Sequence, residues 1–196
     1  MEVSTDESLV AAYACGDTAA FGELVRRYGD GVLGYLVHMT GNRDQAEDLF
    51  QETFKKVHEK SHTFRGEHFK SWLFTIATRT AIDAARRKKI TTVSLNQQID
   101  SDCDEAPARG AVIADEDALD PADEAVREEQ KAQVREAVEA LPVRQRATLI
   151  LAYYQQLSYQ EVARVLNCSI GTVKAQMSRA LMTLAQRLPD SVSVTK

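Results

Sequence analysis

Two histidines one helical turn apart have the spacing of a metal-binding motif. The segment His58-Glu59-Lys60-Ser61-His62 matches the pattern His-Glu-x-x-His, in which both imidazoles bind zinc and the glutamate activates water. On a helical wheel both histidines fall on the polar side of the predicted helix, and no third ligand is evident in the sequence. A zinc protease is therefore one alternative to weigh, but we expect no metal site, no catalytic residue and no cofactor.

A second pattern, near residue 160, has the spacing of a DNA-binding motif. Ser158-Tyr159-Gln160-Glu161 is a capping box, in which the Ser158 hydroxyl and the Glu161 carboxylate each accept from the other residue's backbone amide. The turn Asn167-Cys168-Ser169 separates the helix that begins there from a second helix that begins at Ile170. This spacing predicts a helix-turn-helix.

The second helix of this motif combines an apolar face with a polar and basic face. Ile170, Val173 and Leu181 are among the residues expected to face inward. Short polar and basic side chains reach base edges and phosphates in the major groove. The predicted DNA contacts are Thr172, Lys174, Ala175, Ser178 and Arg179. An ordinary helical hairpin with a solvated face is the other interpretation that these residues alone allow.

Two charged patches lie in the first half of the chain. A predicted helix that begins near Phe69 ends in four consecutive basic residues, Arg86-Arg87-Lys88-Lys89. Basic residues stabilise a helix C-terminus, but four in a row are more than this stabilisation requires. The helix predicted from residue 43 to 61 has an apolar face and an acidic face. The acidic face contains Asp44, Asp48, Gln51 and Glu52. Each patch is either a solvated surface or a binding surface.

The elements that carry these residues are predicted to be helices throughout. Helical periodicity extends to about residue 89 and returns from about 124 to 188, and no stretch alternates as strands do. Helix breaks are expected at Gly16, at Gly41-Asn42 and at 62–67. We therefore predict an all-α protein with two small helical domains, the second containing the helix-turn-helix.

The segment between the two helical blocks is acidic and rich in turn-forming residues. Residues 100–129 contain twelve acids and two arginines, a net charge of −10, so the remaining residues sum to +5 against the overall −5. Residues 65–89 and 130–196 each carry an excess of +5. We predict domains at 1–89 and 124–190, joined by a flexible acidic linker at 90–123.

Composition indicates a cytoplasmic protein. With 44% apolar residues among 196, the chain has enough apolar side chains for a core. No apolar run approaches the roughly 20 residues needed to span a bilayer, and the first residues are acidic rather than basic. The cysteines Cys15, Cys103 and Cys168 are odd in number and lack ligand spacing, so we expect reduced, structural thiols.

Three segments, in order, resemble bacterial RNA polymerase sigma factors of the extracytoplasmic-function (ECF) subfamily. Asp44-Gln45-Ala46-Glu47-Asp48-Leu49-Phe50-Gln51-Glu52 resembles the family's polymerase-binding helix. Phe64-Arg65-Gly66-Glu67, followed by Phe69, Trp72 and Ile82-Asp83, resembles its promoter-melting segment. Ala140-Leu141-Pro142, Leu157-Ser158-Tyr159-Gln160-Glu161 and Gly171-Thr172-Val173-Lys174 resemble its upstream-element reader.

The resemblance implies a role for each patch. Core RNA polymerase would be bound by Asp44, Glu47, Asp48, Gln51 and Glu52. Minus-ten DNA would be contacted by Phe64, Arg65, Lys70, Arg79, Arg86, Arg87, Lys88 and Lys89, with Trp72 packed in the core. The helix from Ile170 would read the minus-thirty-five element. The family also implies an anti-sigma factor as partner, promoter DNA as ligand, no membrane insertion and no enzymatic activity.

Three departures from the family pattern and one alternative function accompany this interpretation. Arg79 stands where many relatives have asparagine, Ser178 and Ala175 replace stronger contact residues, and the loop after Glu67 is one residue short. The preferred promoter sequence therefore does not follow from the resemblance. A helix-turn-helix regulator that acts without polymerase would bind duplex DNA as a dimer with symmetric half-sites. DNA binding by the free protein, rather than by its polymerase complex, would favour that alternative.

Overall fold

The computed structural model describes residues 5–66, 68–95 and 121–188, and of residues 88–95 and 121–127 the backbone alone. The elements are α1 (Asp6–Ala14), α2 (Thr18–Thr40), α3 (Arg43–Lys60), the short 3-10 helix η1 (Ser61–Thr63), α4 (Phe69–Leu95), α5 (Pro121–Glu139), α6 (Val143–Tyr153), α7 (Tyr159–Leu166) and α8 (Ile170–Arg187). No strand occurs in these ranges, and the predicted all-α fold is confirmed.

The boundaries of α2 and α3 lie where the sequence places capping residues. Asp17 accepts hydrogen bonds from the amides of Ala19 and Ala20 at the start of α2, and Asn42 accepts from the amide of Gln45 at the start of α3. Gly41 ends α2 with a left-handed φ of 68°, which costs glycine little. The breaks predicted at Gly16 and at Gly41-Asn42 are confirmed.

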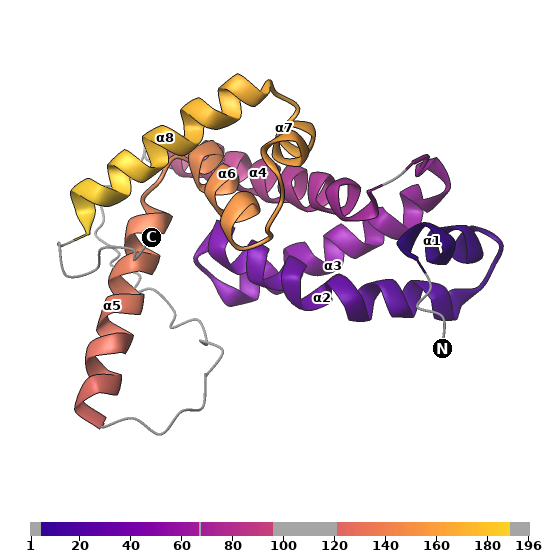
Figure 1. Cartoon of the computed structure of the whole chain (residues 1–196), viewed down its shortest axis with the longest axis horizontal. Coiled ribbons are helices and arrows are strands. Elements are labelled where there is room, and N and C mark those ends of the chain that lie inside the picture. The colour runs from indigo at the N-terminus through magenta and orange to yellow at the C-terminus, as the bar shows by residue number, and fades with distance from the viewer. Residues whose placement is uncertain (1–4, 67, 96–120, 189–196) are drawn as a thin grey trace.

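The first four helices form an N-terminal unit around a dense apolar core (Figure 1). Tyr35 of α2 is completely buried, and its hydroxyl lies 2.8 Å from the hydroxyl of Thr78 on α4. The apolar face predicted for α3 is confirmed, because Ala46, Leu49, Thr53, Phe54 and Val57 are buried and Phe50 packs against them. The acidic face of α3 is therefore left on the outside.

The last four helices form a C-terminal unit in which α8 packs across α5, α6 and α7. Its small apolar cluster consists of Val138, Leu141, Leu149, Met177 and Ala180. Ile170 and Leu181 of α8 were expected inside but are 41% and 44% exposed. That prediction is wrong because the apolar stripe of α8 is wider than the surface that its neighbouring helices cover.

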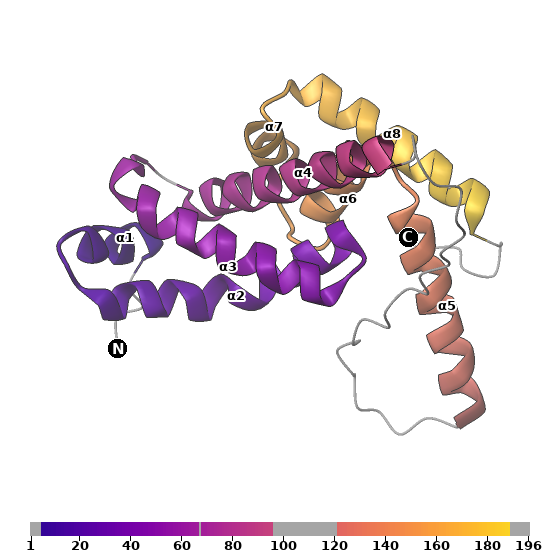
Figure 2. The ribbon, with the colours of Figure 1, turned by 180° about the vertical axis from the view of Figure 1, so that it is seen from behind.

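The two units pack against each other through α7 on α4 and α6 on α2, and the views from front and back agree (Figures 1 and 2). One continuous set of buried apolar residues includes Leu36 and Leu73 from the first unit and Ile150 and Val162 from the second. The sequence predicted two domains but not this docking. It also ended the fourth helix near residue 89, whereas α4 continues to Leu95. Most of the predicted linker, 96–120, lies outside the described residues.

The structure also bears on the cysteines and on membrane insertion. Cys15 and Cys168 are unbridged, and Cys168 packs against the core. Cys15 is exposed and does not have the packing role expected of it, while Cys103 lies outside the described residues. Within the described ranges, no helix is long and apolar enough to cross a membrane.

Candidate nucleic-acid and polymerase interfaces

The predicted capping box holds the first helix of the helix-turn-helix in place. The Glu161 carboxylate accepts from the Ser158 amide at 2.8 Å, and the Ser158 hydroxyl accepts from the Glu161 amide at 3.3 Å. The hydrogen bond from the Ser158 hydroxyl is the largest contribution that lowers the pKa of Glu161. The turn that follows ends α7 with Asn167 in a left-handed conformation, at φ 49°. The capping box and the turn are both confirmed.

The second helix of the motif, α8, presents the predicted polar face to solvent. Ser169 caps it by accepting from the Thr172 amide at 3.1 Å, while Val173 and Met177 are buried beneath. The exposed residues of this face are Thr172, Lys174, Ala175, Ser178 and Arg179. The neighbouring Gln176 is turned inward, where it accepts a 2.6 Å hydrogen bond from the hydroxyl of Thr148 on α6. All five predicted contact residues therefore lie on one accessible face.

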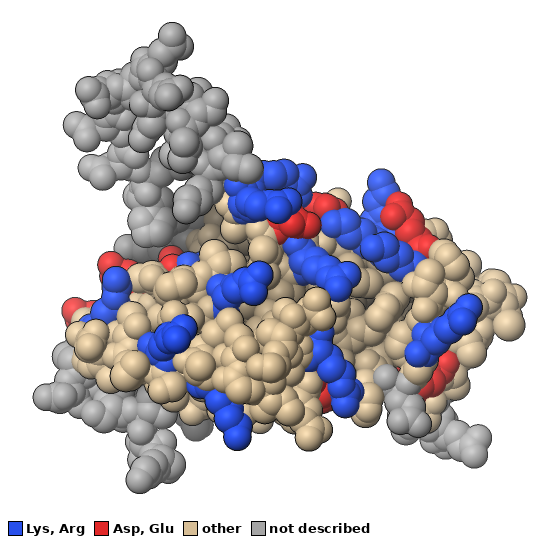
Figure 3. All heavy atoms as spheres, turned by 90° about the horizontal axis from the view of Figure 1, so that it is seen from above, with Lys and Arg blue, Asp and Glu red and all other residues tan. Residues whose placement is uncertain are grey.

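Basic side chains also line the outer side of α4. Arg79, Arg86 and Arg87 are exposed, whereas the side chains of Lys88 and Lys89 lie outside the described residues. Arg86 approaches Asp83 at 3.6 Å, a pair too exposed to hold Arg86 firmly, and Arg87 approaches Glu52 at 3.9 Å. Both α4 and α8 lie in the upper half of Figures 1 and 2, and Figure 3 shows Lys and Arg side chains scattered over that side.

The loop before α4 differs from a freely accessible base-binding loop. Phe64 is half-buried and packs against Phe69 and Trp72, with ring centroids 5.7 and 5.3 Å apart, while Arg65 is exposed. Trp72 is half-buried within this aromatic cluster, in keeping with its predicted packing role. Lys70 is partly buried, because its ammonium group donates to the backbone carbonyl of Gln155 in the C-terminal unit at 2.7 Å. Of these predicted DNA contacts, Arg65 alone is exposed in this arrangement.

The acidic face of α3 lies on the far side of that helix from the core. Asp44, Glu47, Asp48 and Gln51 are exposed. Glu52 is half-buried and forms an ion pair with Lys56 at 2.7 Å, in addition to its contact with Arg87. Glu47 pairs with Arg43 at 2.9 Å. The five predicted polymerase-binding residues thus share one surface. On it, neighbouring basic side chains partly neutralise the charges of Glu47 and Glu52.

The histidine motif does not form a recognisable metal centre. The Nδ1 atom of His58 contacts the hydroxyl of Tyr13, and its ring packs edge-on against Phe21. Both His58 and His62 are exposed. In the part of the chain that the structure describes, no three His, Cys, Asp or Glu side chains cluster closely enough to hold a metal ion.

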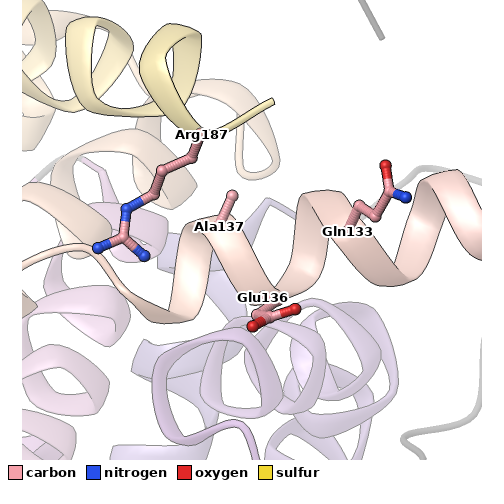
Figure 4. A pocket seen from close by; sticks show the side chains of 4 residues that line it. All are labelled: Gln133, Glu136, Ala137 and Arg187. Atoms are coloured by element: carbon pink, nitrogen blue, oxygen red, sulfur yellow. The ribbon is translucent and has the colours of Figure 1, made fainter. Parts of the chain in front are cut away.

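A shallow crevice between α5 and α8 is also without catalytic features. Its lining residues are Gln133, Glu136, Ala137 and Arg187. Figure 4 shows Arg187 and Ala137 on the side of α5 that faces α8, while the Glu136 carboxylate points to the other side of α5. None of these four is a nucleophile activated by a neighbouring base. Fold and surface together define a helical, helix-turn-helix nucleic-acid-binding protein with a separate acidic face on α3.

Comparison with known proteins identifies the family. Residues 24–90 match Sigma-70 region 2 and residues 131–184 match Sigma-70 region 4. The chain is 31% identical over 176 residues to the RNA polymerase sigma-H factor of Pseudomonas aeruginosa, covering 89% of each chain. It is 30% identical over 179 residues to the ECF RNA polymerase sigma factor SigW of Bacillus subtilis, covering 89% of this chain and 92% of SigW. The chain belongs to the ECF RNA polymerase sigma factors.

Solved structures of this fold agree with the helical architecture. The sigma factor RpoE of Bartonella quintana, in complex with the anti-sigma factor NepR, superimposes with a TM-score of 0.67 at 24% identity, covering 85% of this chain and 94% of RpoE. CnrH, in complex with the cytosolic domain of CnrY, gives a TM-score of 0.64 at 23% identity, covering 92% of this chain and 95% of CnrH. At these identities the likeness establishes the fold.

Sequence reasoning missed the residues that join the two units. Arg146 and Gln155 donate hydrogen bonds to backbone carbonyls of α2, and neither was singled out for an interdomain contact. A signal existed for Arg146, because it is a permanently charged residue directly before the apolar run 147–152. For Gln155, which follows that run in a turn, no local pattern distinguishes a docking residue from a solvated one.

Proposed function

We propose that this sigma factor uses three separate surfaces to start transcription. The acidic face of α3 docks on core RNA polymerase, α4 and the loop before it contact minus-ten DNA, and α8 reads the minus-thirty-five element. This assigns polymerase binding and melting to residues 1–89 and upstream recognition to residues 124–190. The observation that carries the proposal is the accessible polar face of α8. The N-termini of α7 and α8 are both capped, and both helices lie inside the region 4 match.

The acidic face of α3 has the properties of a docking surface for a basic partner. Asp44, Asp48 and Gln51 are exposed on a helix whose opposite side is fixed in the core. Complementary charge accelerates encounter and suppresses wrong partners more than it adds affinity. Because this face lies within the region 2 match, we infer that it binds a basic surface of the polymerase.

The basic side of α4 supports strand capture. Arg79, Arg86 and Arg87 are positioned to hold phosphates, and Lys88 and Lys89 extend the same run in sequence. Single-stranded DNA is held by a cationic groove together with base-binding pockets, so capture of an opened strand shifts the equilibrium toward melting without any bond being broken. We therefore infer that the chain has no enzymatic activity of its own.

Two further assignments rest on the family. RpoE and CnrH were solved in complexes with NepR and CnrY, of which NepR is an anti-sigma factor, and we infer that this chain is also held by an anti-sigma factor. A cytoplasmic location follows from the proposed function alone, because the chain must meet the polymerase on the chromosome.

The proposed function is tested by comparing the binding of promoter DNA by this chain in the presence and in the absence of core polymerase. Core polymerase with this chain should protect promoter DNA from about the minus-thirty-five element through the minus-ten element, and the free chain should not. A symmetric footprint of the free chain on duplex DNA would instead support a helix-turn-helix regulator that acts as a dimer.

A further inference from the structure

Tyr13, Phe21 and His58 form a small cluster where three helices of the N-terminal unit meet. The hydroxyl of Tyr13, in α1, is hydrogen-bonded to Nδ1 of His58, in the last turn of α3. The ring of Phe21, in α2, stacks on that of Tyr13 with centroids 4.8 Å apart and meets that of His58 edge-on at 6.1 Å. Aromatic pairs in these geometries contribute more than the apolar area that they bury. The cluster therefore fixes the C-terminal end of α3 against α1 and α2.

The last turn of α3 is bonded in turn to the loop that follows it. The His58 carbonyl accepts from both the amide and the hydroxyl of Ser61, the latter at 2.9 Å. The Ser61 carbonyl accepts from the Phe64 amide at 3.1 Å. In addition, α1 contacts η1 directly, at the end of the N-terminal unit where α3 leads into this loop (Figures 1 and 2). A continuous set of contacts thus joins Tyr13 to Phe64.

A second aromatic cluster holds the loop from its other side. The ring of Phe64 packs against those of Phe69 and Trp72 at the start of α4. Arg65, the next residue, is exposed. The backbone that carries Phe64 and Arg65 is therefore fixed both by η1, toward α1 and α3, and by the aromatic rings of α4.

A base-binding loop benefits from a backbone that is fixed before DNA arrives. A loop that is already ordered in its bound conformation loses less conformational freedom on binding and so binds more tightly. Phe64 and Arg65 are the residues of this loop that the proposed function assigns to minus-ten DNA. Tyr13 and Phe21 precede residues 24–90, the region 2 match, so this support for the loop comes from outside the matched segment.

We propose that the cluster of Tyr13, Phe21 and His58 holds the loop of residues 61–66 in place, and that Tyr13 is a positioning residue for minus-ten recognition. This inference rests on the proposed function, because a fixed loop matters only if it contacts minus-ten DNA. It gives the first histidine of the His-Glu-x-x-His segment a role that requires no metal. Polymerase docking should not depend on the cluster, because His58 lies ten residues, about 15 Å, beyond Asp48 along α3.

Minus-ten selectivity tests the positioning role. Tyr13→Phe keeps the ring that stacks on Phe21 and removes only the hydroxyl. The matched control, Tyr153→Phe, makes the same change at a 54% exposed position of α6. Each chain is assembled with core polymerase and assayed on a promoter found by mapping RNA 5′ ends, and on copies of that promoter with single substitutions in the minus-ten element. The measured quantity is the ratio of transcripts from the intact promoter to transcripts from the substituted copies.

Tyr13→Phe should lower this ratio by about two- to tenfold, the range for loss of one hydrogen bond. The intact element loses contacts that the substituted copies already lack. Co-purification with core polymerase should stay at the wild-type level, and Tyr153→Phe should keep the wild-type ratio. An unchanged ratio in Tyr13→Phe, including an equal fall on every promoter from loss of folded protein, would overturn the positioning role. A wild type that shows no preference for the intact minus-ten element would overturn the proposed function, and the positioning role with it.

Hydrogen exchange tests the same role without DNA. The Phe64 amide is protected by its bond to the Ser61 carbonyl, and its exchange requires local opening of the loop. Tyr13→Phe and His58→Leu, which remove the two partners of one hydrogen bond, should each accelerate this exchange by about two- to tenfold. The double variant should exchange no faster than the faster single variant, because both changes remove the same bond. Wild-type exchange in Tyr13→Phe, or effects that multiply in the double variant, would overturn the proposal.

Discussion

Arg146 donates from its guanidinium group to the carbonyl oxygen of Met39, 2.7 Å away, and so joins α6 to the C-terminal end of α2. The same guanidinium donates to the carbonyls of Glu139 and Leu141 at the end of α5, the latter at 3.2 Å. The last carbonyls of a helix have no partner within it and carry partial negative charge. One half-buried cation therefore satisfies the ends of two helices, although its partial burial lowers the pKa of Arg146.

Replacing Arg146 should destabilise the interface between the units. Arg146→Met keeps most of the side chain's length but leaves the three carbonyls without this donor, which should lower the free energy of unfolding by about 1–3 kcal/mol. Denaturant unfolding followed by circular dichroism measures the loss. Arg144→Met is the matched control, because Arg144 is exposed on the same helix. Equal stability of the two variants would contradict this role.

The capping box makes a separate contribution to the helix-turn-helix. Ser158→Ala removes the hydroxyl that accepts from the Glu161 amide, and loss of such a cap costs about 1 kcal/mol. The expected result is a lower thermal midpoint with the fold retained. Gln160→Ala, an exposed change two residues along, should leave the midpoint almost unchanged. A smaller effect at Ser158 than at Gln160 would contradict the cap assignment.

The half-buried histidine at the interface, His38, should make stability depend on pH. Burial, with a smaller effect from Arg135, lowers the pKa of His38 below its usual 6.5. Between the lowered pKa and 6.5 the unfolded chain binds a proton that the folded chain does not, so stability is complete above 6.5 and declines as the pH falls through the folded pKa. The hydrogen-bonded Glu161 carboxyl, whose pKa is also lowered, adds a similar loss below 4.5.

The measurement is the free energy of unfolding at about pH 7.5 and at about pH 5.5, in the wild type and in His38→Gln. The wild type should lose stability at the lower pH, and the variant should lose less, because it has no imidazole to protonate at this position. An identical pH dependence in both proteins would show that His38 does not cause it.

Charge reversal on α3 should separate polymerase binding from folding. Asp48→Lys combined with Glu52→Lys should abolish co-purification with core polymerase, because the docking face would then repel a basic partner. The fold should survive, since the ion pairs that Glu52 forms with Lys56 and Arg87 are partly open to solvent and contribute about 1 kcal/mol each at most. Glu59→Lys, on an exposed position of the same helix, is the control. Unchanged co-purification of the double variant would exclude this face as the docking site.

Upstream recognition should depend on Arg179. Its side chain is exposed on the polar face of α8, and loss of a base contact should weaken binding of the polymerase complex to its preferred element by about 1–3 kcal/mol. Affinities for the preferred and for scrambled upstream sequences give the answer. An equal loss of affinity on both sequences would mean that Arg179 contacts phosphate. The control is Arg187→Ala, near the far end of α8, which should reduce the affinity much less.

Local structure was predictable from the sequence, whereas the docking of the units was not. The boundaries of α2 and α3 follow from Asp17, Gly41 and Asn42, whose effects extend over only a few residues. The capping box and the apolar face of α3 follow from fixed spacings in the same way. By contrast, the bond from Gln155 to Gly31 joins residues 124 positions apart, and nothing in the local pattern of either residue indicates it.

The exposed sites were predicted better than the half-buried ones. All five predicted residues of α8 are accessible, because helical periodicity alone fixes which side of a capped helix faces outward. Phe64 and Lys70 are predicted DNA contacts, but the ring of Phe64 packs against Trp72 because of the course of the loop before α4, and the bond of Lys70 to Gln155 depends on how helices distant in sequence meet. The half-exposure of Ile170 and Leu181 has the same origin, since a helical wheel does not show how far neighbouring helices extend.

The central claim is that this chain gives promoter specificity to core RNA polymerase. The most direct measurement is in vitro transcription of genomic fragments by purified core polymerase, with and without the chain, followed by mapping of the RNA 5′ ends. We expect new start sites that require the chain and share sequence elements about 10 and about 35 base pairs upstream. Identical start sites and yields in both reactions would contradict the claim.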